Sequence, residues 1–371
     1  MNMGQIKEKI GIKEFIAIFI LSIGPKLTDD TPAILYGYLE NAAWMTPIII
    51  GVISIIPIYF LTKVITLYQR KSLIDIIIHL FGKYIGFFLL FILWIIQSYG
   101  IIIDSATYTD IIGTMYFTNT PTLVAYALLM AISAYGAKKG LEHIGSFAWT
   151  VFTLIKVSTF IVFIMTFVQG NFDYAFPIFG PGKWEIIKES TTHLSLLIDF
   201  LYLGLIVPFI KSSSDYKKGT WFALAFLITE FSIALIGYVI LFDHEAVKMF
   251  NYPFHESIRY IQFGFLTNIE FLFFPFWIVS SFVRFAFYLY LNALLFGGIF
   301  KIKQFEYIIP TLATLFVFLG MIPENPTFII FHLRENFLHL ITPVFFLLPC
   351  LLWVMAKLKG DLKSEKANAS K

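Results

Sequence analysis

The chain is 371 residues long, 58% hydrophobic and 14% charged, with a formal net charge of +3. Soluble domains are about 25% charged, so this composition excludes an ordinary soluble protein and indicates an integral membrane protein. Its one cysteine, Cys350, excludes a disulfide framework and a thiolate metal site. The motifs GxxxxGK[ST], HExxH and GxSxG are absent and the His residues are scattered. We therefore predict a non-enzymatic protein without a cofactor or metal.

The first apolar stretch, residues 12–39, is interrupted at its middle by helix breakers and charges: Gly24, Pro25, Lys26, Asp29, Asp30 and Pro32. Proline and glycine weaken a helix, and charges at membrane depth must face protein or water. We therefore expect two half-helices, 12–22 and 28–39, joined by unwound backbone that marks a mid-membrane ligand site. The alternative is a proline-kinked helix in which Lys26 pairs with Asp29.

Ten stretches are long enough to cross about 30 Å of hydrocarbon, which takes roughly 20 helical residues. They cover residues 12–39, 44–68, 84–116, 121–137, 141–168, 192–210, 221–242, 265–300, 307–322 and 338–357. The amphipathic segment 71–83 is predicted to lie on the membrane surface as a short helix. We expect another short helix in the loop 243–260.

These stretches predict one transmembrane domain, residues 1–357, followed by a polar tail, 358–371. If the ten spans divide five and five, the first and sixth are equivalent, and both carry helix breakers and acids at mid-depth. Because five is odd, the second half enters the membrane in the opposite sense. The result is an inverted repeat of residues 12–168 and 192–357, with the ligand site where the two broken helices meet.

The Lys and Arg residues that flank the spans predict the orientation. They gather on alternate loops, together with both ends of the chain. The opposite side has only Lys183, Lys188, Lys248, Arg259 and Arg334. This bias places both termini in the cytoplasm.

Lys156 lies near the middle of the fifth span, about 20 Å of helix from either end, too far for its ammonium to reach the surface. It must face the interior and find an anionic or carbonyl partner. A static ion pair is one interpretation. The others are that the ammonium replaces a sodium ion beside the unwound segments, or that it releases a proton during a transport cycle.

Four more charges lie deep in apolar stretches: Asp104, Asp199, Glu230 and Arg284. With Asp29 and Asp30 added, acids outnumber bases at this depth. Either several acids share one base, or some of them are protonated at neutral pH.

Tyr99, Trp277 and Ser281 lie where an interior face could present them to a small polar solute. A Trp or Tyr in such a chain is more often an interface anchor or a core residue. The sequence leaves both interpretations open.

The pattern of Pro, Gly and aromatic residues in four runs resembles the spore germination permease family, the B subunits of germinant receptors. The runs are PIFGPGKWEIIKESTTHLSLLIDFLYLGLIVPFIK, NYPFHESIRYIQFGFLTNIEFLFFPFWIVSSFVRF, MIPENPTF and LPCLLWVMAKLKG. The resemblance implies an all-α membrane protein of the amino acid, polyamine and organocation transporter superfamily, with ten helices in a LeuT-like 5+5 arrangement. It also implies the spore inner membrane, an A subunit and a lipoprotein C subunit as partners, and no nucleic acid.

The resemblance also implies where the ligand binds. The corresponding residues are Gly24, Pro25, Tyr99, Leu197, Ile198, Asp199, Leu201, Trp277, Ser281 and Phe285. Lys156 resembles a fifth-helix lysine of sodium-independent members of the superfamily. The chain departs from the family in the segment GPKLTDD, where a Gly-rich turn is usual, and at Asp199, where Glu is usual.

We therefore expect a receptor that binds a small germinant, an amino acid, between the broken helices and signals to partner subunits in the bilayer. The rival is a proton-coupled amino acid permease that uses the same site. A third hypothesis is a scaffold whose site is vestigial.

Overall fold

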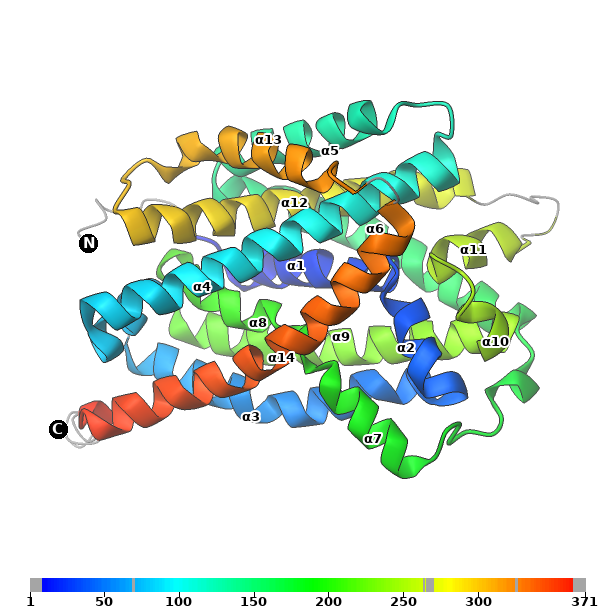
Figure 1. Ribbon diagram of the computed structural model, residues 1–371, viewed down its shortest axis with the longest axis horizontal. Coiled ribbons are helices and arrows are strands. Elements are labelled where there is room, and N and C mark those ends of the chain that lie inside the picture. Colours follow the sequence, from blue (N-terminus) through cyan, green and yellow to red (C-terminus); the bar gives the residue numbers. More distant parts are fainter. Residues whose placement is uncertain (1–8, 69–70, 263, 265–269, 324–325, 363–371) are drawn as a thin grey trace.

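Long apolar runs in a bilayer satisfy their backbone hydrogen bonds within helices, and the structure consists of helices running along one long axis (Figure 1). The computed structural model describes residues 9–68, 71–262, 264, 270–323 and 326–362. The α-helices are α1 (Ile12–Ile23), α2 (Thr31–Leu39), α3 (Thr46–Leu67), α4 (Leu73–Ile111), α5 (Thr122–Lys138), α6 (Leu141–Gln169), α7 (Lys183–Thr192), α8 (Asp199–Tyr202), α9 (Ser213–Phe242), α10 (His244–Val247), α11 (Pro253–Tyr260), α12 (Glu270–Phe300), α13 (Ile309–Gly320) and α14 (Pro326–Leu358).

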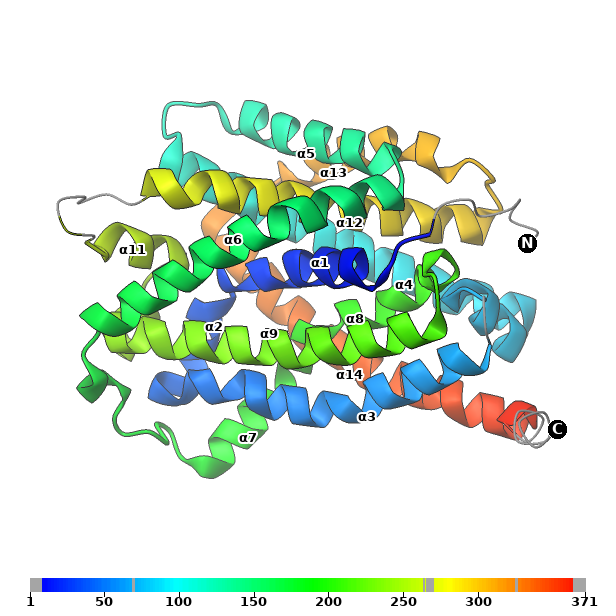
Figure 2. The same cartoon turned by 180° about the vertical axis from the view of Figure 1, so that it is seen from behind.

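Helix α1 is the central element of the bundle. Its residues from Ala17 to Ile23 are all buried, as expected for a helix that is apolar on every side. It packs against α6, α9 and α12, and in the view from behind α6 crosses above it and α9 runs below it (Figure 2). The break that follows α1 therefore lies deep inside the protein.

The sixth span is a series of short helical pieces. They are η5 (Leu194–Leu197), α8, η6 (Leu203–Leu205) and η7 (Val207–Phe209). Its far end pairs with the start of α1, because Ile10 N–H donates to Phe209 C=O at 2.9 Å and Lys211 N–H donates to Ile10 C=O at 3.1 Å. The first and sixth spans, far apart in the sequence, are thus joined side by side. The prediction that both are broken is confirmed.

Six helical segments in the described residues are long and apolar enough to cross a membrane. Three shorter apolar helical segments accompany them: Thr122–Lys138, Leu194–Leu205 and Phe305–Gly320. The chain is therefore a multi-pass membrane protein. The count of ten spans stays a prediction.

Several predicted boundaries were wrong. Helix α2 starts at Thr31 rather than 28, because the Asp29 carboxylate accepts the Thr31 N–H at 2.8 Å and a proline occupies its first turn. Helix α9 starts at Ser213 rather than 221, where Ser212 Oγ caps it by accepting the Asp215 N–H at 3.0 Å. A side-chain N-cap therefore marks the start of α9, whereas α2 starts after a turn in which Asp29, one residue before the N-cap, accepts the Thr31 N–H.

The segment predicted to lie on the surface is helical and continues into the third span. Gly82 separates the two with a φ of 78°, a left-handed conformation that glycine adopts without strain. The loop 243–260 holds two short helices, α10 and α11, where we expected one. Residues 265–269, assigned to the eighth span, lie outside the described residues.

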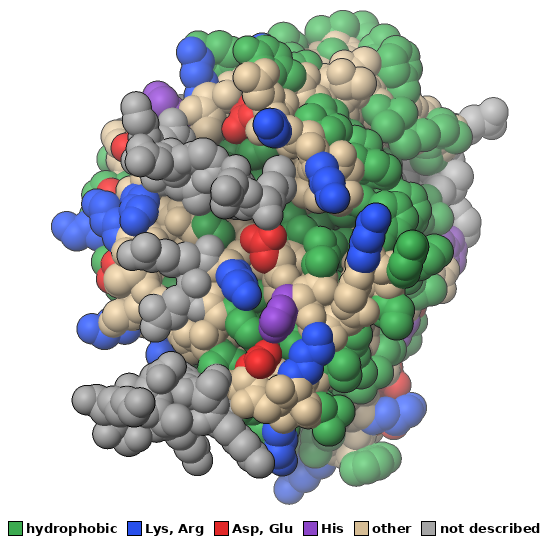
Figure 3. Space-filling view, turned by 90° about the vertical axis from the view of Figure 1, so that its left-hand side faces the viewer, with side chains coloured by type: hydrophobic (Ala, Val, Ile, Leu, Met, Phe, Trp, Pro, Cys, Tyr) green, Lys and Arg blue, Asp and Glu red, His purple; other side chains and the backbone are tan. Residues whose placement is uncertain are grey.

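Helix α1 starts and helix α14 ends at the same end of the bundle (Figure 1). Figure 3 looks onto this end, where Lys and Arg side chains are spread over the face among fewer Asp and Glu side chains.

Candidate ligand-binding site

The unwound turn after α1, η1 (Gly24–Leu27), forms because Pro25 cannot donate a backbone hydrogen bond. Side chains from the turn and its neighbours satisfy the freed carbonyl groups. Thr28 Oγ1 donates to Pro25 C=O at 2.7 Å, and Tyr108 Oη donates to the same oxygen at 2.9 Å. Tyr238 Oη donates to Leu27 C=O at 3.0 Å. The break is therefore held open by surrounding protein, as unwound backbone in a bilayer requires.

Lys26 connects the two broken segments directly. Its Nζ donates to Leu196 C=O at 2.8 Å and lies 2.5 Å from Asp199 Oδ2. Tyr288 Oη donates to the other Asp199 oxygen at 2.7 Å. The kinked-helix alternative, in which Lys26 pairs with Asp29, is wrong because its partner comes from the sixth span.

Arg334 of α14 is the centre of a second buried cluster. Its Nη1 lies 3.0 Å from Asp29 Oδ2, and its Nε lies 2.7 Å from Asp30 Oδ1 without the alignment of a hydrogen bond. Its Nη2 lies 3.1 Å from Asp104 Oδ1. Arg284 also pairs with Asp104. The excess of acids had two possible explanations: several acids share one base, or some of them are protonated. The structure shows the first, because Arg334 lies beside three carboxylates.

Arg334 was predicted to lie in an outer loop beside the tenth span, and this prediction was wrong. The tenth span was predicted to start at residue 338, whereas α14 starts at Pro326, so Arg334 lies inside the helix and is buried. A charged residue usually ends a transmembrane span, but three nearby carboxylates compensate this one. The excess of acids over bases at mid-depth was the signal in the sequence that could have predicted a further buried base.

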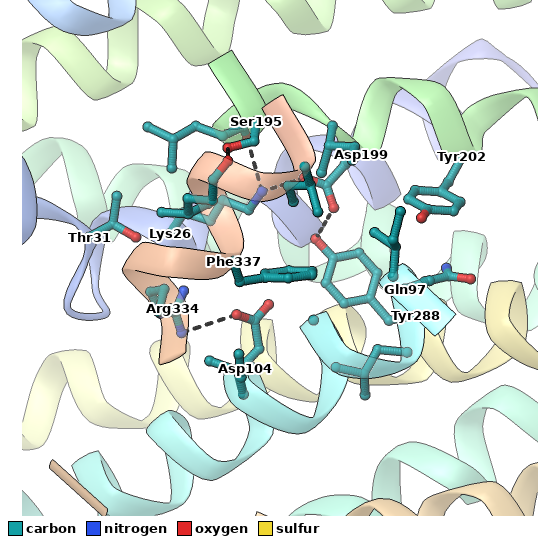
Figure 4. Close-up of a pocket in the computed structure, with 18 of the residues that line it drawn as sticks. Lys26, Thr31, Gln97, Asp104, Ser195, Asp199, Tyr202, Tyr288, Arg334 and Phe337 are labelled. Atoms are coloured by element: carbon teal, nitrogen blue, oxygen red, sulfur yellow. Dashed lines mark hydrogen bonds and ion pairs between the residues drawn. The ribbon is translucent and has the colours of Figure 1, made fainter. Parts of the chain in front are cut away.

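A cavity of about 70 Å³ lies between these two clusters. Since one water needs about 10–15 Å³ on this measure, it can hold a small solute. Its polar and aromatic lining residues are Lys26, Thr31, Gln97, Asp104, Ser195, Asp199, Tyr202, Phe287, Tyr288, Arg334 and Phe337. The Phe337 ring lies between the Lys26–Asp199 pair and the Arg334–Asp104 pair (Figure 4). We call this space the central cavity.

A second cavity, of about 50 Å³, lies on the other side of η1. Lys156 Nζ lies 2.5 Å from Glu230 Oε1 there, and the other Glu230 oxygen is buried without a hydrogen-bond partner. A Cβ on Gly24 would lie 3.3 Å from Lys156 Nζ and 3.4 Å from Glu230 Oε2. Glycine thus lets the ion pair approach the unwound backbone closely. Lys156 has the anionic partner that its depth requires.

The predicted site residues fall into three groups. Ile198 and Asp199 line the central cavity, whereas Gly24, Pro25, Lys156 and Trp277 line the second cavity. Among the described lining residues, neither cavity includes Tyr99, Leu197, Leu201, Ser281 or Phe285.

These five residues have packing roles in the structure. Tyr99 packs on Phe337 with ring centroids 4.8 Å apart, and Phe285 packs on Tyr108. Ser281 Oγ donates to Trp277 C=O at 2.8 Å, while Leu197 and Leu201 are buried in the core. Whether any predicted residue contacts a ligand stays a prediction. Sequence reasoning missed the lining residues Gln97 and Phe337.

In the described part of the chain, no three His, Cys, Asp or Glu side chains are grouped as metal ligands.

Two solved structures have the same fold. MhsT in complex with L-phenylalanine matches with a TM-score of 0.64 and 14% identity, over 94% of this chain and 89% of that chain. Mhp1, a nucleobase-cation-symport-1 family transporter, matches with a TM-score of 0.61 and 12% identity, over 92% of this chain and 78% of that chain. The fold and its broken central helices thus define an all-α membrane protein with a LeuT-like fold.

The family is defined by sequence. A model of the spore germination protein family, Spore_permease, matches residues 12–329, so the chain belongs to that family. Spore germination protein B2 of Bacillus subtilis (strain 168) is 22% identical over 196 residues, 53% of each chain. Spore germination protein KB of the same organism is 22% identical over 237 residues, 62% of each chain. The chain thus matches between half and two thirds of the length of these relatives.

Proposed function

We propose that this protein is the germinant-sensing membrane subunit of a spore germinant receptor, which binds a small molecule, an amino acid, in the central cavity. Family membership and the LeuT-like fold support this role. The single observation that carries it is the cavity between the first, third, sixth, eighth and tenth spans, at the point where two of them unwind. Cavities bounded by broken helices at mid-membrane are typical ligand sites.

The charge balance of the central cavity favours a ligand with no net charge. Its wall carries two bases, Lys26 and Arg334, and two acids, Asp104 and Asp199. Bringing an additional net charge into a balanced, poorly hydrated site is costly. A zwitterion instead offers a carboxylate to a base and an ammonium to an acid, so an amino acid suits this wall.

Helix α14 supplies a route from the ligand to partner subunits. It carries Arg334 and Phe337 at the cavity, and the chain directly after it carries Asp361, which accepts a hydrogen bond from Tyr68 at 2.5 Å. A ligand that binds more tightly to one position of α14 would shift the helix towards that position. The contacts at this end of the bundle, such as Tyr68–Asp361, would then change. We place this end in the cytoplasm of the spore, with the protein in the inner membrane beside A and C subunits. The basic side chains on this face support that orientation.

The alternative function is a proton-coupled amino acid permease, and the second cavity favours it. A buried Lys156–Glu230 pair with one unpartnered carboxylate oxygen can exchange a proton more readily than a fully bonded pair can. In this alternative, the pair would couple the proton to movement of the adjacent unwound segment.

Two measurements test these proposals. Thermal unfolding of the purified chain with a panel of L-amino acids should show stabilisation by at least one of them. Asp199→Asn should abolish that shift, whereas Asp173→Asn, an exposed outer residue, should retain it. A ligand shift that survives Asp199→Asn would place binding elsewhere. Saturable uptake of the same amino acid into proteoliposomes by this chain alone would favour the permease over the receptor.

A further inference from the structure

Gln97 of α4 lines the central cavity without a hydrogen-bond partner for its amide oxygen. The residue is 8% exposed. A buried acceptor left unsatisfied costs about 1–3 kcal/mol, so such groups in native proteins usually have a protein, water or ligand partner. Gln97 therefore indicates a place where a partner from outside the chain binds.

The polar residues next to Gln97 are bonded to each other and leave it unpartnered. Asn292 Nδ2 donates to Ser98 Oγ at 2.9 Å, and Trp94 Nε1 donates to Asn292 Oδ1 at 3.0 Å. The nearby hydroxyl of Tyr202 donates to Leu93 C=O at 2.9 Å. None of these three donors is directed to the Gln97 oxygen.

Gln97 lies at the end of the cavity away from the Arg334 cluster. It precedes Asp104 by seven residues on α4, which is about 10 Å of helix. Tyr288 stands between Gln97 and Phe337, and Tyr202 lies beside Gln97 (Figure 4). A zwitterion held by the charged pairs would therefore direct its side chain towards Gln97.

We propose that Gln97 is a recognition site for a hydrogen-bond donor on the ligand's side chain, so that the preferred ligand is a small amino acid with an uncharged hydroxyl or amide group. This inference rests on the proposed function and narrows its ligand class. Apolar residues around Gln97, Ile96 and Leu291 among them, leave few other partners for such a donor. A buried acceptor discriminates strongly against an analogue that lacks the donor.

Pairs of amino acids that differ in one side-chain hydroxyl group test the proposal. L-threonine and L-valine differ only by a hydroxyl in place of a methyl group, and L-serine and L-alanine differ by one hydroxyl. On the wild-type chain, isothermal calorimetry or thermal shift should give about tenfold tighter binding for the hydroxyl member of each pair. Equal binding of both members would overturn the inference.

The variant Gln97→Met has a side chain of similar length without an amide. It should bind L-threonine and L-valine with affinities within about twofold of each other, through weaker binding of L-threonine. Gln169→Met is the matched control, since the Gln169 amide is paired with the Gln262 backbone far from the cavity. It should keep the tenfold preference. A preference that survives Gln97→Met would overturn the inference.

Failure of the proposed function would look different. If no amino acid stabilises the wild-type chain, the amino acid site itself is wrong, and this inference falls with it. If amino acids bind without preference for the hydroxyl, only the role of Gln97 is wrong. Should Gln97→Met fail to fold, the wild-type comparison of L-threonine with L-valine decides alone.

Discussion

The two sides of the unwound turn η1 carry buried charges in different arrangements. On the side of the central cavity, three bases and four acids form the Lys26–Asp199 pair and one larger cluster. In this larger cluster two bases share three acids: Arg284, Arg334, Asp29, Asp30 and Asp104. On the other side, Lys156 and Glu230 form one isolated pair. The Lys156 side chain is 16% exposed, whereas those of Arg334 and Arg284 are 5% and 0% exposed.

This difference indicates which charged residues stabilise the fold and which can change their protonation state. Removing one member of a buried cluster leaves several charges uncompensated, and this is strongly destabilising. An isolated pair leaves one charge, which can be neutralised by a proton. We therefore expect the central clusters to fix the packing of the broken helices, and the Lys156–Glu230 pair to tolerate a change of protonation.

The largest effect should follow from Arg334→Met. Three carboxylates lose their shared base, so the free energy of unfolding should fall by about 3–5 kcal/mol. Thermal unfolding in detergent measures the loss. The matched control is Arg259→Met, at an arginine whose side chain is 37% exposed, with Glu270 at 2.7 Å and Glu256 at 4.0 Å. This variant should lose about 1 kcal/mol or less, because exposed ion pairs contribute little. Similar losses in the two variants would contradict the distinction between the clusters and ordinary ion pairs.

Lys156→Met should be less damaging, with a loss of about 2 kcal/mol, because Glu230 can take up a proton once its partner is removed. The double variant Lys156→Met with Glu230→Gln should recover part of this loss. A double-mutant cycle from thermal unfolding gives the coupling between the two residues, which we expect to be about 1–2 kcal/mol. A coupling near zero would show that the pair is not a unit.

Phe337→Ala tests the aromatic ring that divides the central cavity. Phe337 is half-buried, so the loss of stability should be about 1–2 kcal/mol, below the 3–5 kcal/mol typical of a fully buried ring. The enlarged cavity should also bind bulkier amino acids more tightly than the wild type does. Leu340→Ala on the same helix, at a side chain that is 70% exposed, should change neither property. A ligand profile unchanged by Phe337→Ala would remove Phe337 from the cavity wall.

The effect that is smallest near neutral pH concerns the outer helix α11, which contributes Phe254 to the wall of the second cavity. Burial, with a contribution from Arg259, lowers the pKa of His255 to about 3. An unfolded histidine titrates near 6.5, so the unfolded state binds more protons between these values. The stability from neutral His255 is therefore lost as the pH falls below about 6.5, by up to about 1.4 kcal/mol per pH unit.

His255→Gln should flatten this dependence between pH 6.5 and 5 in thermal unfolding. His244→Gln is the control, because His244, the first residue of α10, has a side chain that is 19% exposed and lies 2.8 Å and 3.2 Å from the carboxylates of Asp243 and Glu245. An equal pH dependence in wild type and His255→Gln would show that His255 does not titrate on unfolding.

Much of the fold could be predicted because the membrane restricts the choices. Apolar runs must be helices, so Gly24 and Pro25 in the middle of one run predicted the break that η1 forms. The same reasoning failed for Arg334, which was assigned to a loop. Sequence hydropathy evaluates each charge alone, whereas the bundle brings Asp29, Asp30 and Asp104 to it from two other spans.

The candidate site was harder to predict than the fold. Asp199 was expected from its depth and lines the central cavity, but Gln97 carried no signal as one polar residue in an apolar run. Tyr99, which was predicted to contact the ligand, lies two residues after Gln97 and packs against Phe337 instead. One residue along a helix turns a side chain by about 100°, and only the packing of neighbouring helices decides which direction faces the cavity.

The sequence by itself determined that this protein crosses a membrane, that its first and sixth spans come apart, and that buried charges must find partners. These follow from the cost of placing polar groups in hydrocarbon, which acts on each segment separately. Only the tertiary structure decided that Lys26 pairs with Asp199, that one arginine serves three carboxylates, and that two cavities flank the same turn. Those outcomes depend on distances between spans that are far apart in the chain, and no local pattern encodes them.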